Sequence, residues 1–131
     1  MLRLRDLSQF PSFYSNRQRS IRQTIVNVSK VDKGEGFTEI LGASKDYNPT
    51  IRILGDKIAQ NASVQISCNC KSFQFEFAHA VYKDGTLLNP QQFKKEVLDK
   101  PLKKNAYLIP SGCKHIIALQ NLFMRNISKF T

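Results

Sequence analysis

Residues 63–70 read SVQISCNC and residues 111–119 read SGCKHIIAL, and these two stretches hold all three cysteines and one of the two histidines of the chain. They supply a Cys-x-Cys pair and a Cys-x-His pair. A closed structural zinc site takes four cysteine or histidine ligands in a tetrahedral arrangement, so the two pairs predict one zinc ion. The predicted metal ligands are Cys68, Cys70, Cys113 and His115.

The first pair lies at the end of a predicted strand, and the second pair lies at the beginning of a predicted helix. Val64 and Ile66 alternate with polar residues ahead of the cysteines, so both thiols are expected to project to the same side. Pro110-Ser111-Gly112 precedes the second pair and an apolar run follows it, which is typical of a helix beginning. The positive end of a helix also favours a thiolate over a thiol.

Two other interpretations of these residues stay open. Buried cysteine is a common small apolar residue and a single histidine is usually structural, so the pattern could arise by chance. A redox or disulfide role is the further alternative, although a disulfide between Cys68 and Cys70 has poor geometry on a strand and three cysteines leave one unpaired. The other histidine, His79, is the only substitute ligand, and we expect it to be a packed or surface residue.

The two pairs resemble the SWIM-type zinc finger, whose pattern is Cys-x-Cys, a variable insert, and then Cys-x-His with an apolar helix directly after it. The stretches CNCKSFQFEF and SGCKHIIAL are also similar to small SWIM-type proteins of tailed bacteriophages. The resemblance covers about residues 63–125, and it departs from compact members of the family in an insert of 42 residues, 71–112. It implies binding to nucleic acid or to protein.

The chain is strongly basic, because 20 lysines and arginines against 10 acidic residues give its 131 residues a net charge of +10. Residues 1–30 carry +5 and residues 63–131 carry +6. Such a field predicts nucleic acid or another polyanion as a partner, and a surface that only keeps the protein soluble is the alternative. The residues expected to bind nucleic acid or a protein partner are Arg3, Arg5, Arg17, Arg19, Arg22, Lys94, Lys95, Lys103 and Lys104.

The sequence predicts one compact domain with an α+β fold. Residues 1–23 mix arginines with apolar residues around Pro11, which predicts a basic extended N-terminal arm lying on a protein neighbour or on nucleic acid. Residues 24–62 form a β-rich segment, and residues 63–131 form the SWIM-like zinc module. The fold is expected to be a small, mostly antiparallel sheet plus a C-terminal helix, stapled by one structural zinc ion.

Runs of β-branched residues predict strands over residues 24–31, 37–41, 50–54 and 62–67, with a hairpin turn at 32–36. In the insert, the helical spacing of three apolar side chains favours a helix over a strand, and residues 91–98 are expected to form one or two helical turns. Those three side chains are Phe73, Phe77 and Val81. The last helix is predicted over Lys114–Ile127, with an apolar stripe facing the core. The stripe consists of Ile116, Leu119, Phe123 and Ile127.

No enzyme motif is present: the chain has no glycine-rich phosphate loop after a strand, no serine elbow and no supported pair of carboxylates. The absence of an apolar span or signal core predicts an intracellular or virion protein that is neither secreted nor membrane-bound. We therefore expect a non-enzymatic structural or interaction protein without a small-molecule substrate, such as a phage virion component docking through its arm. The alternative is a DNA- or RNA-binding protein without sequence preference that uses its basic surface.

Overall fold

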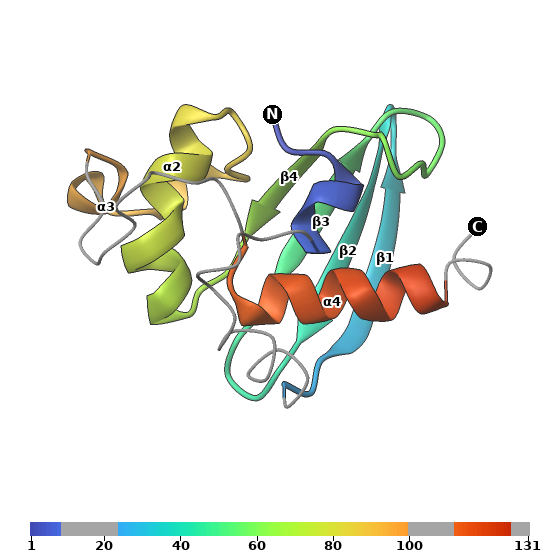
Figure 1. Ribbon diagram of the computed structural model, residues 1–131, viewed down its shortest axis with the longest axis horizontal. Helices are drawn as coiled ribbons and strands as arrows, with labels where there is room; N and C mark the ends of the chain where they lie inside the picture. Colours follow the sequence, from blue (N-terminus) through green and yellow to red (C-terminus); the bar gives the residue numbers. More distant parts are fainter. Residues whose placement is uncertain (9–23, 100–111, 127–131) are drawn as a thin grey trace.

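The structure, a computed structural model, describes residues 1–8, 24–99 and 112–126 (Figure 1). It confirms the predicted α+β fold, with a four-stranded antiparallel sheet and a C-terminal helix. The strands are β1 (Asn27–Gly34), β2 (Phe37–Ala43), β3 (Thr50–Leu54) and β4 (Val64–Ser67). The helical segments are η1 (Leu4–Ser8), η3 (Phe73–Phe77), α2 (Ala78–Lys83), η4 (Pro90–Gln92), α3 (Lys95–Asp99) and α4 (Lys114–Arg125).

The sheet is a meander in the order β1-β2-β3-β4, so each strand pairs with its neighbour in sequence. Strand β3 begins and ends at the predicted residues, and β4 begins two residues later than predicted. The prediction for β1 is wrong at both ends, because the strand runs from Asn27 to Gly34. Gly34 pairs with Phe37, and Gly36 has a φ of +76°, so a tight two-residue turn lets the pairing extend to residue 34.

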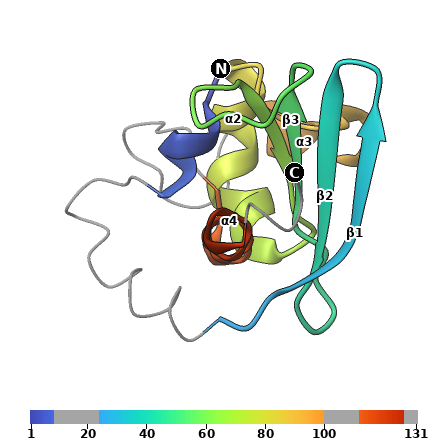
Figure 2. The ribbon, with the colours of Figure 1, turned by 90° about the vertical axis from the view of Figure 1, so that its right-hand side faces the viewer.

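Helix α4 lies across one face of the sheet, and Figure 2 looks along it with η1 and α2 on the same side. Alternate residues of the strands point to that face, as the strict alternation of buried and half-buried positions along β2 and β3 shows. The helix approaches β2 closely at Gly42, where a Cβ atom would lie 3.0 Å from both methyl carbons of Leu119. In the described ranges, none of the helices has the length and apolar character needed to cross a membrane.

Residues 1–8 do not form an extended arm, which corrects the prediction for this part of the chain. The amide of Leu4 donates to the carbonyl of Ala62 at 2.9 Å, and the amide of Val64 donates to the carbonyl of Leu2 at 2.9 Å. Leu4 and Leu7 are fully buried in the same core as the sheet and α4. In an extended arm the two leucine side chains would be exposed to water. Burying them in the core stabilises the observed structure instead. Residues 9–23 lie outside the described residues.

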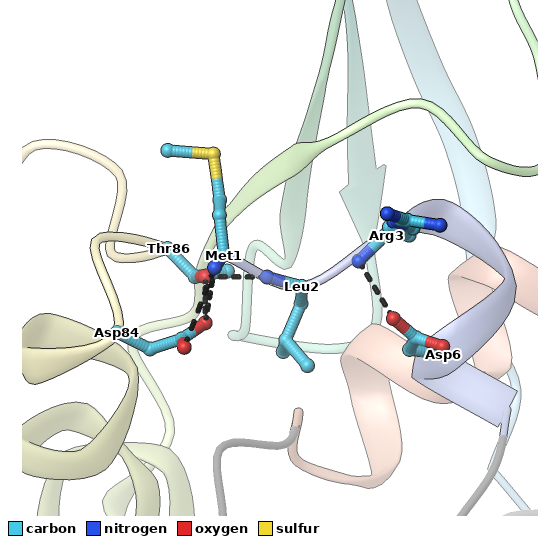
Figure 3. A network of polar contacts seen from close by, with 6 residues as sticks. All are labelled: Met1, Leu2, Arg3, Asp6, Asp84 and Thr86. Atoms are coloured by element: carbon cyan, nitrogen blue, oxygen red, sulfur yellow. Dashed lines mark hydrogen bonds and ion pairs between the residues drawn. The ribbon is translucent and has the colours of Figure 1, made fainter.

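Polar contacts also fix the first residues against the segment that follows α2 (Figure 3). The Thr86 hydroxyl accepts a hydrogen bond from the amide of Leu2 at 2.9 Å and donates one to the Asp84 carboxylate at 2.6 Å. The amino group of Met1 lies 3.4 Å from the same carboxylate. These contacts place residues 1–3 beside the edge of β4, where Arg3 forms a bridge with Ser63.

The insert begins with η3, a turn of π-helix that continues into α2, so the predicted helix is confirmed and the strand alternative is wrong. Phe73, Phe77 and Val81 are all buried. The chain then returns along β4, where the amide of Ile66 donates to the carbonyl of Thr86 at 2.7 Å and the amide of Leu88 donates to the carbonyl of Ile66 at 2.9 Å. The insert therefore covers the edge of the strand that leads to the cysteines.

Candidate metal centre

Four buried ligand atoms meet where β4 ends and α4 begins. The Sγ atoms of Cys68, Cys70 and Cys113 and a ring nitrogen of His115 all lie within 4.8 Å of one another. The Nδ1 atom of His115 lies 4.0 Å from the Sγ of Cys68 and 3.8 Å from the Sγ of Cys113. A tetrahedral zinc ion with ordinary bond lengths separates sulfur and nitrogen ligands by about 3.6 Å. These two pairs need only a slight contraction to hold one metal ion, and the most widely separated pair has to close by up to about 1 Å.

Cys68 and Cys70 lie on the same side of the chain, as the alternation of apolar and polar residues before them predicted. Val64, Ile66, Cys68 and Cys70 are buried, and the residues between them are half-buried or exposed. The regular strand ends at Ser67, but the alternation continues through the two cysteines. Both thiols thus project to the core side of the sheet, where α4 begins.

The second pair occupies the first positions of α4. Cys113 is the residue that precedes the helix, its φ and ψ of −73° and 175° are extended, and its carbonyl accepts a hydrogen bond from the amide of Ile117 at 3.1 Å. His115 follows within the first turn. The helix dipole places partial positive charge at this end, which stabilises a thiolate there.

Gly112 allows the turn into α4 to close tightly. A Cβ atom at this position would lie 2.6 Å from Cγ2 and 2.7 Å from Cβ of Ile116. These atoms belong to the base of a buried, branched side chain, so they cannot move aside easily. Any larger residue at Gly112 displaces the backbone that carries Cys113.

Asn69, the residue between the first two cysteines, was not recognised in the sequence as part of the site. Its exposed side chain joins the metal ligands to the loop between β2 and β3: the amide of Asn48 donates to its Oδ1 at 2.7 Å, and its Nδ2 donates to the carbonyl of Asp46 at 3.2 Å. Gln74 Nε2 donates to the Asn69 carbonyl at 2.9 Å. Asparagine side chains often form hydrogen bonds with backbone groups. The presence of an asparagine between the two cysteines was therefore the only sign in the sequence of this role.

Burial and mutual hydrogen bonding raise the pKa values of Cys68 and Cys113 and lower the pKa of Cys70. Hydrogen bonds from the Cys113 and Cys68 thiols lower the pKa of Cys70, which also accepts a hydrogen bond from the amide of Phe73 at 3.3 Å. Burial raises the pKa of Cys113. The hydrogen bond with Cys113 lowers the pKa of Cys68, but the bond with Cys70 and burial outweigh it and raise this pKa to about 12. A metal ion must therefore displace protons from Cys68 and Cys113.

The two histidines have different surroundings, as expected. His115 directs Nδ1 towards the sulfur atoms, and its ring packs against Tyr47 with centroids 4.9 Å apart. The Nδ1 of His79 lies 2.6 Å from the carbonyl oxygen of Leu98 and must carry the proton, because a carbonyl only accepts. His79 is buried and joins α2 to α3, away from the metal-ligand cluster. It is a packed structural residue.

The structure describes four of the nine residues predicted to bind a polyanion or a protein partner. Arg3, Arg5, Lys94 and Lys95 are exposed. The two arginines belong to the η1 region and the two lysines lie at α3, which stands on the far side of α2 (Figure 1). The four described residues therefore come from two separate elements. Arg17, Arg19, Arg22, Lys103 and Lys104 lie outside the described residues.

Comparison with protein-family models, with curated proteins and with solved structures finds no match to this chain. The resemblance to SWIM-type zinc fingers stays a prediction from the spacing of four residues. The ability to hold a metal ion rests on the geometry and donor chemistry of the cluster itself.

Proposed function

We propose that Cys68, Cys70, Cys113 and His115 bind one structural zinc ion in a non-enzymatic, SWIM-like interaction domain. The observation that carries this proposal is the approach of four buried ligand atoms to within 4.8 Å of one another. Three thiolates and one imidazole are soft and borderline donors, so they favour zinc over hard cations such as magnesium or calcium. The first two ligands end a strand and the last two open a helix, in keeping with the SWIM pattern.

A structural role follows from the number of ligands and from their places in the chain. Four protein ligands complete a tetrahedral shell, and no position remains for the water or substrate that a catalytic zinc requires. The ion would join the end of β4 to the beginning of α4 across the insert at 71–112. Such a cross-link supplements the hydrophobic core of a small domain.

Elemental analysis of the purified, reduced protein tests the metal assignment. We expect one zinc ion per chain, and replacement by cobalt should produce the visible absorption bands of a tetrahedral thiolate site. Cys113→Ser should lower the zinc content, whereas Ser29→Ala, at an exposed position outside the ligand cluster, should not. Less than about half an equivalent of metal under zinc-replete conditions, iron in place of zinc, or a disulfide among the three cysteines would refute the proposal.

Binding of nucleic acid without sequence preference is the second candidate, supported by the net charge of +10 and the exposure of Arg3, Arg5, Lys94 and Lys95. Leu4 and Leu7 pack inside the chain itself, so these two side chains are not available to dock on a protein neighbour. Affinity for DNA should fall steeply between about 50 and 200 mM salt, and neutralising Lys94, Lys95, Lys103 and Lys104 together should flatten that dependence. Salt-independent binding would contradict the electrostatic mechanism.

A further inference from the structure

A cleft of about 560 Å³ opens on the outer side of His115, next to the metal ligands. Its walls come from the chain just before β1, the loop after β2 and the first residues of α4. The side chains important for its chemistry are Asn27, Lys45, Tyr47, Lys114 and His115. Its volume lies within the range of small-ligand sites.

The loop that forms one wall of the cleft is held in place by hydrogen bonds. Ser44 and Tyr47 exchange two backbone hydrogen bonds of 2.9 and 3.0 Å, and the Ser44 hydroxyl donates to the carbonyl of Ile25 at 2.7 Å. Asn69 binds the next residues of the loop. The cleft is therefore built on a fixed frame that is continuous with the metal ligands.

His115 provides a buried hydrogen-bond donor at the base of the cleft. Its side chain lines the cleft although the residue is only 5% exposed. Nδ1 lies near the sulfur atoms, so Nε2 is the ring nitrogen that remains for a ligand in the cleft, and no hydrogen bond joins it to a described residue. A metal ion on Nδ1 leaves the proton on Nε2, and metal-bound histidines almost always donate that proton to an oxygen atom.

The charged groups of the cleft also suit an anion. Lys45 and Lys114 contribute two exposed ammonium groups, and none of the described residues that line the cleft is acidic. The neighbouring carboxylate of Asp46 belongs to the same loop but does not line the cleft. Zinc with three thiolates has a net charge of −1, so the two lysines leave a positive balance, which the N-terminal end of α4 increases.

Lys45 occupies a backbone conformation that a lysine rarely adopts. Its φ is +53°, in the left-handed region that glycine tolerates best. Lys45 is a central residue of the tight turn between Ser44 and Tyr47, where glycine would relieve the strain. A lysine held in such a conformation is a candidate for a functional role of its ammonium group.

We propose that this cleft binds one nucleotide unit of a single-stranded nucleic acid. The phosphate accepts hydrogen bonds from His115 Nε2 and from the lysines, and the base stacks on Tyr47, whose side chain is partly exposed at the cleft. The volume and the aromatic ring favour a nucleotide over free phosphate. The inference rests on the proposed zinc site, because the metal ion fixes the proton on Nε2.

Binding of a fluorescently labelled oligothymidylate to zinc-replete protein tests the proposal, with the zinc content of every variant measured first. Lys45→Gln combined with Lys114→Gln should weaken binding at least about tenfold at low salt. The matched control combines Lys33→Gln with Lys83→Gln, two exposed lysines outside the cleft, and should weaken binding less than about threefold. Equal losses in the two pairs would overturn the proposal, because diffuse electrostatic attraction alone gives that result.

Two further variants separate stacking and strain from charge. Tyr47→Leu should weaken binding at least about fivefold, whereas Tyr82→Leu, which changes an exposed tyrosine on α2, should leave it unchanged. Lys45→Gly should retain or raise thermal stability and still weaken binding, because glycine relieves the strained φ and removes the ammonium group. Unchanged binding by Lys45→Gly or Tyr47→Leu would overturn the assignment.

The side-chain NMR signals of the two histidines provide a direct readout. The oligonucleotide should shift the Nε2 signal of His115 and leave the signals of His79, which is bonded to Leu98, unaffected. A His115 shift with inorganic phosphate but not with the oligonucleotide would assign the cleft to a free phosphate compound and overturn the nucleotide proposal. A protein that takes up no zinc refutes the proposed function, whereas a zinc-replete protein that does not bind the oligonucleotide refutes only this inference.

Discussion

Removal of the metal ion from the reduced protein should lower the stability of the whole domain, because the ligands connect elements that share one core. The buried cluster includes Ile40 of β2, Ile66 of β4, and Ile116 and Leu119 of α4. Loss of the connection between β4 and α4 therefore affects the hairpin of β1 and β2 as well. We expect a single unfolding transition at a lower temperature, rather than separate melting of the C-terminal half.

The chain length between the ligands sets the size of this effect. Cys70 and Cys113 are separated by 43 positions in the sequence. Closing a loop of this size costs about 4 kcal/mol of conformational entropy, which the metal cross-link offsets. For a domain of 131 residues the entropy of unfolding converts this free energy into a decrease of about 15 °C in Tm. Tight metal binding makes the decrease larger, because the free energy of binding adds to the stability of the folded state.

Thermal unfolding followed by circular dichroism, with and without a chelator and always with a reductant, measures the decrease. Hydrogen exchange on the same samples should show that amides of β2 and α4 lose protection together. His115→Ala is the matched control, because a variant that holds no metal should not respond to the chelator.

Two results would refute this reasoning. A decrease in Tm of less than about 4 °C after verified loss of metal corresponds to about 1 kcal/mol, which is too little for a folding cross-link. Two separate transitions, with β1 and β2 persisting after α4 has melted, would show that the core does not act as one cooperative unit.

Three further predictions concern the metal ligands and their supports. His115→Ala should abolish metal binding and His79→Ala should preserve it, although both residues are only 5% exposed. Elemental analysis of both variants decides, and the reverse pattern would move the ligand set. Gly112→Ala should cost about 1–3 kcal/mol in a denaturant titration and weaken metal retention, because the new methyl group clashes with the base of a buried isoleucine; wild-type stability would contradict the close approach. Affinity for zinc should rise about 100-fold per pH unit between about pH 6 and 8. The reason is that the raised pKa values of Cys68 and Cys113 keep both thiols protonated until the metal displaces two protons. A zinc affinity that is independent of pH in a chelator competition would contradict this prediction.

The sequence predicted those parts of the structure whose signals are local. The alternation through Val64, Ile66 and the two cysteines places both thiols on one side of the chain, and the glycine before Cys113 marks the beginning of a helix. Both features depend only on neighbouring residues, and both agree with the structure. The helix at Phe73–Phe77 was also predictable, because the spacing of its apolar residues continues into α2.

The errors and omissions involve partners that are distant in the sequence. Leu4 and Leu7 lie in a five-residue 3₁₀ segment, which is too short to show a hydrophobic period, and their burial depends on α4 and on the chain before β4. The contact between Tyr47 and His115 likewise joins residues from two separate elements. No local pattern in the sequence indicates that these two residues line one cleft.

The loop between β2 and β3 links the metal centre to the surface, so zinc and the cleft should not act independently. Asn69 binds this loop from between two metal ligands, and Tyr47 in the same loop packs on the ring of a third ligand, His115. Metal binding that fixes the cysteine pair and the histidine therefore also fixes Lys45 and Tyr47, two of the loop residues that line the cleft. A ligand in the cleft gains affinity when its contacts are ordered in advance. Because coupling between two binding sites is reciprocal, a ligand in the cleft must also raise the affinity of the protein for the metal ion. The structural ion then also determines how strongly the surface cleft binds its ligand.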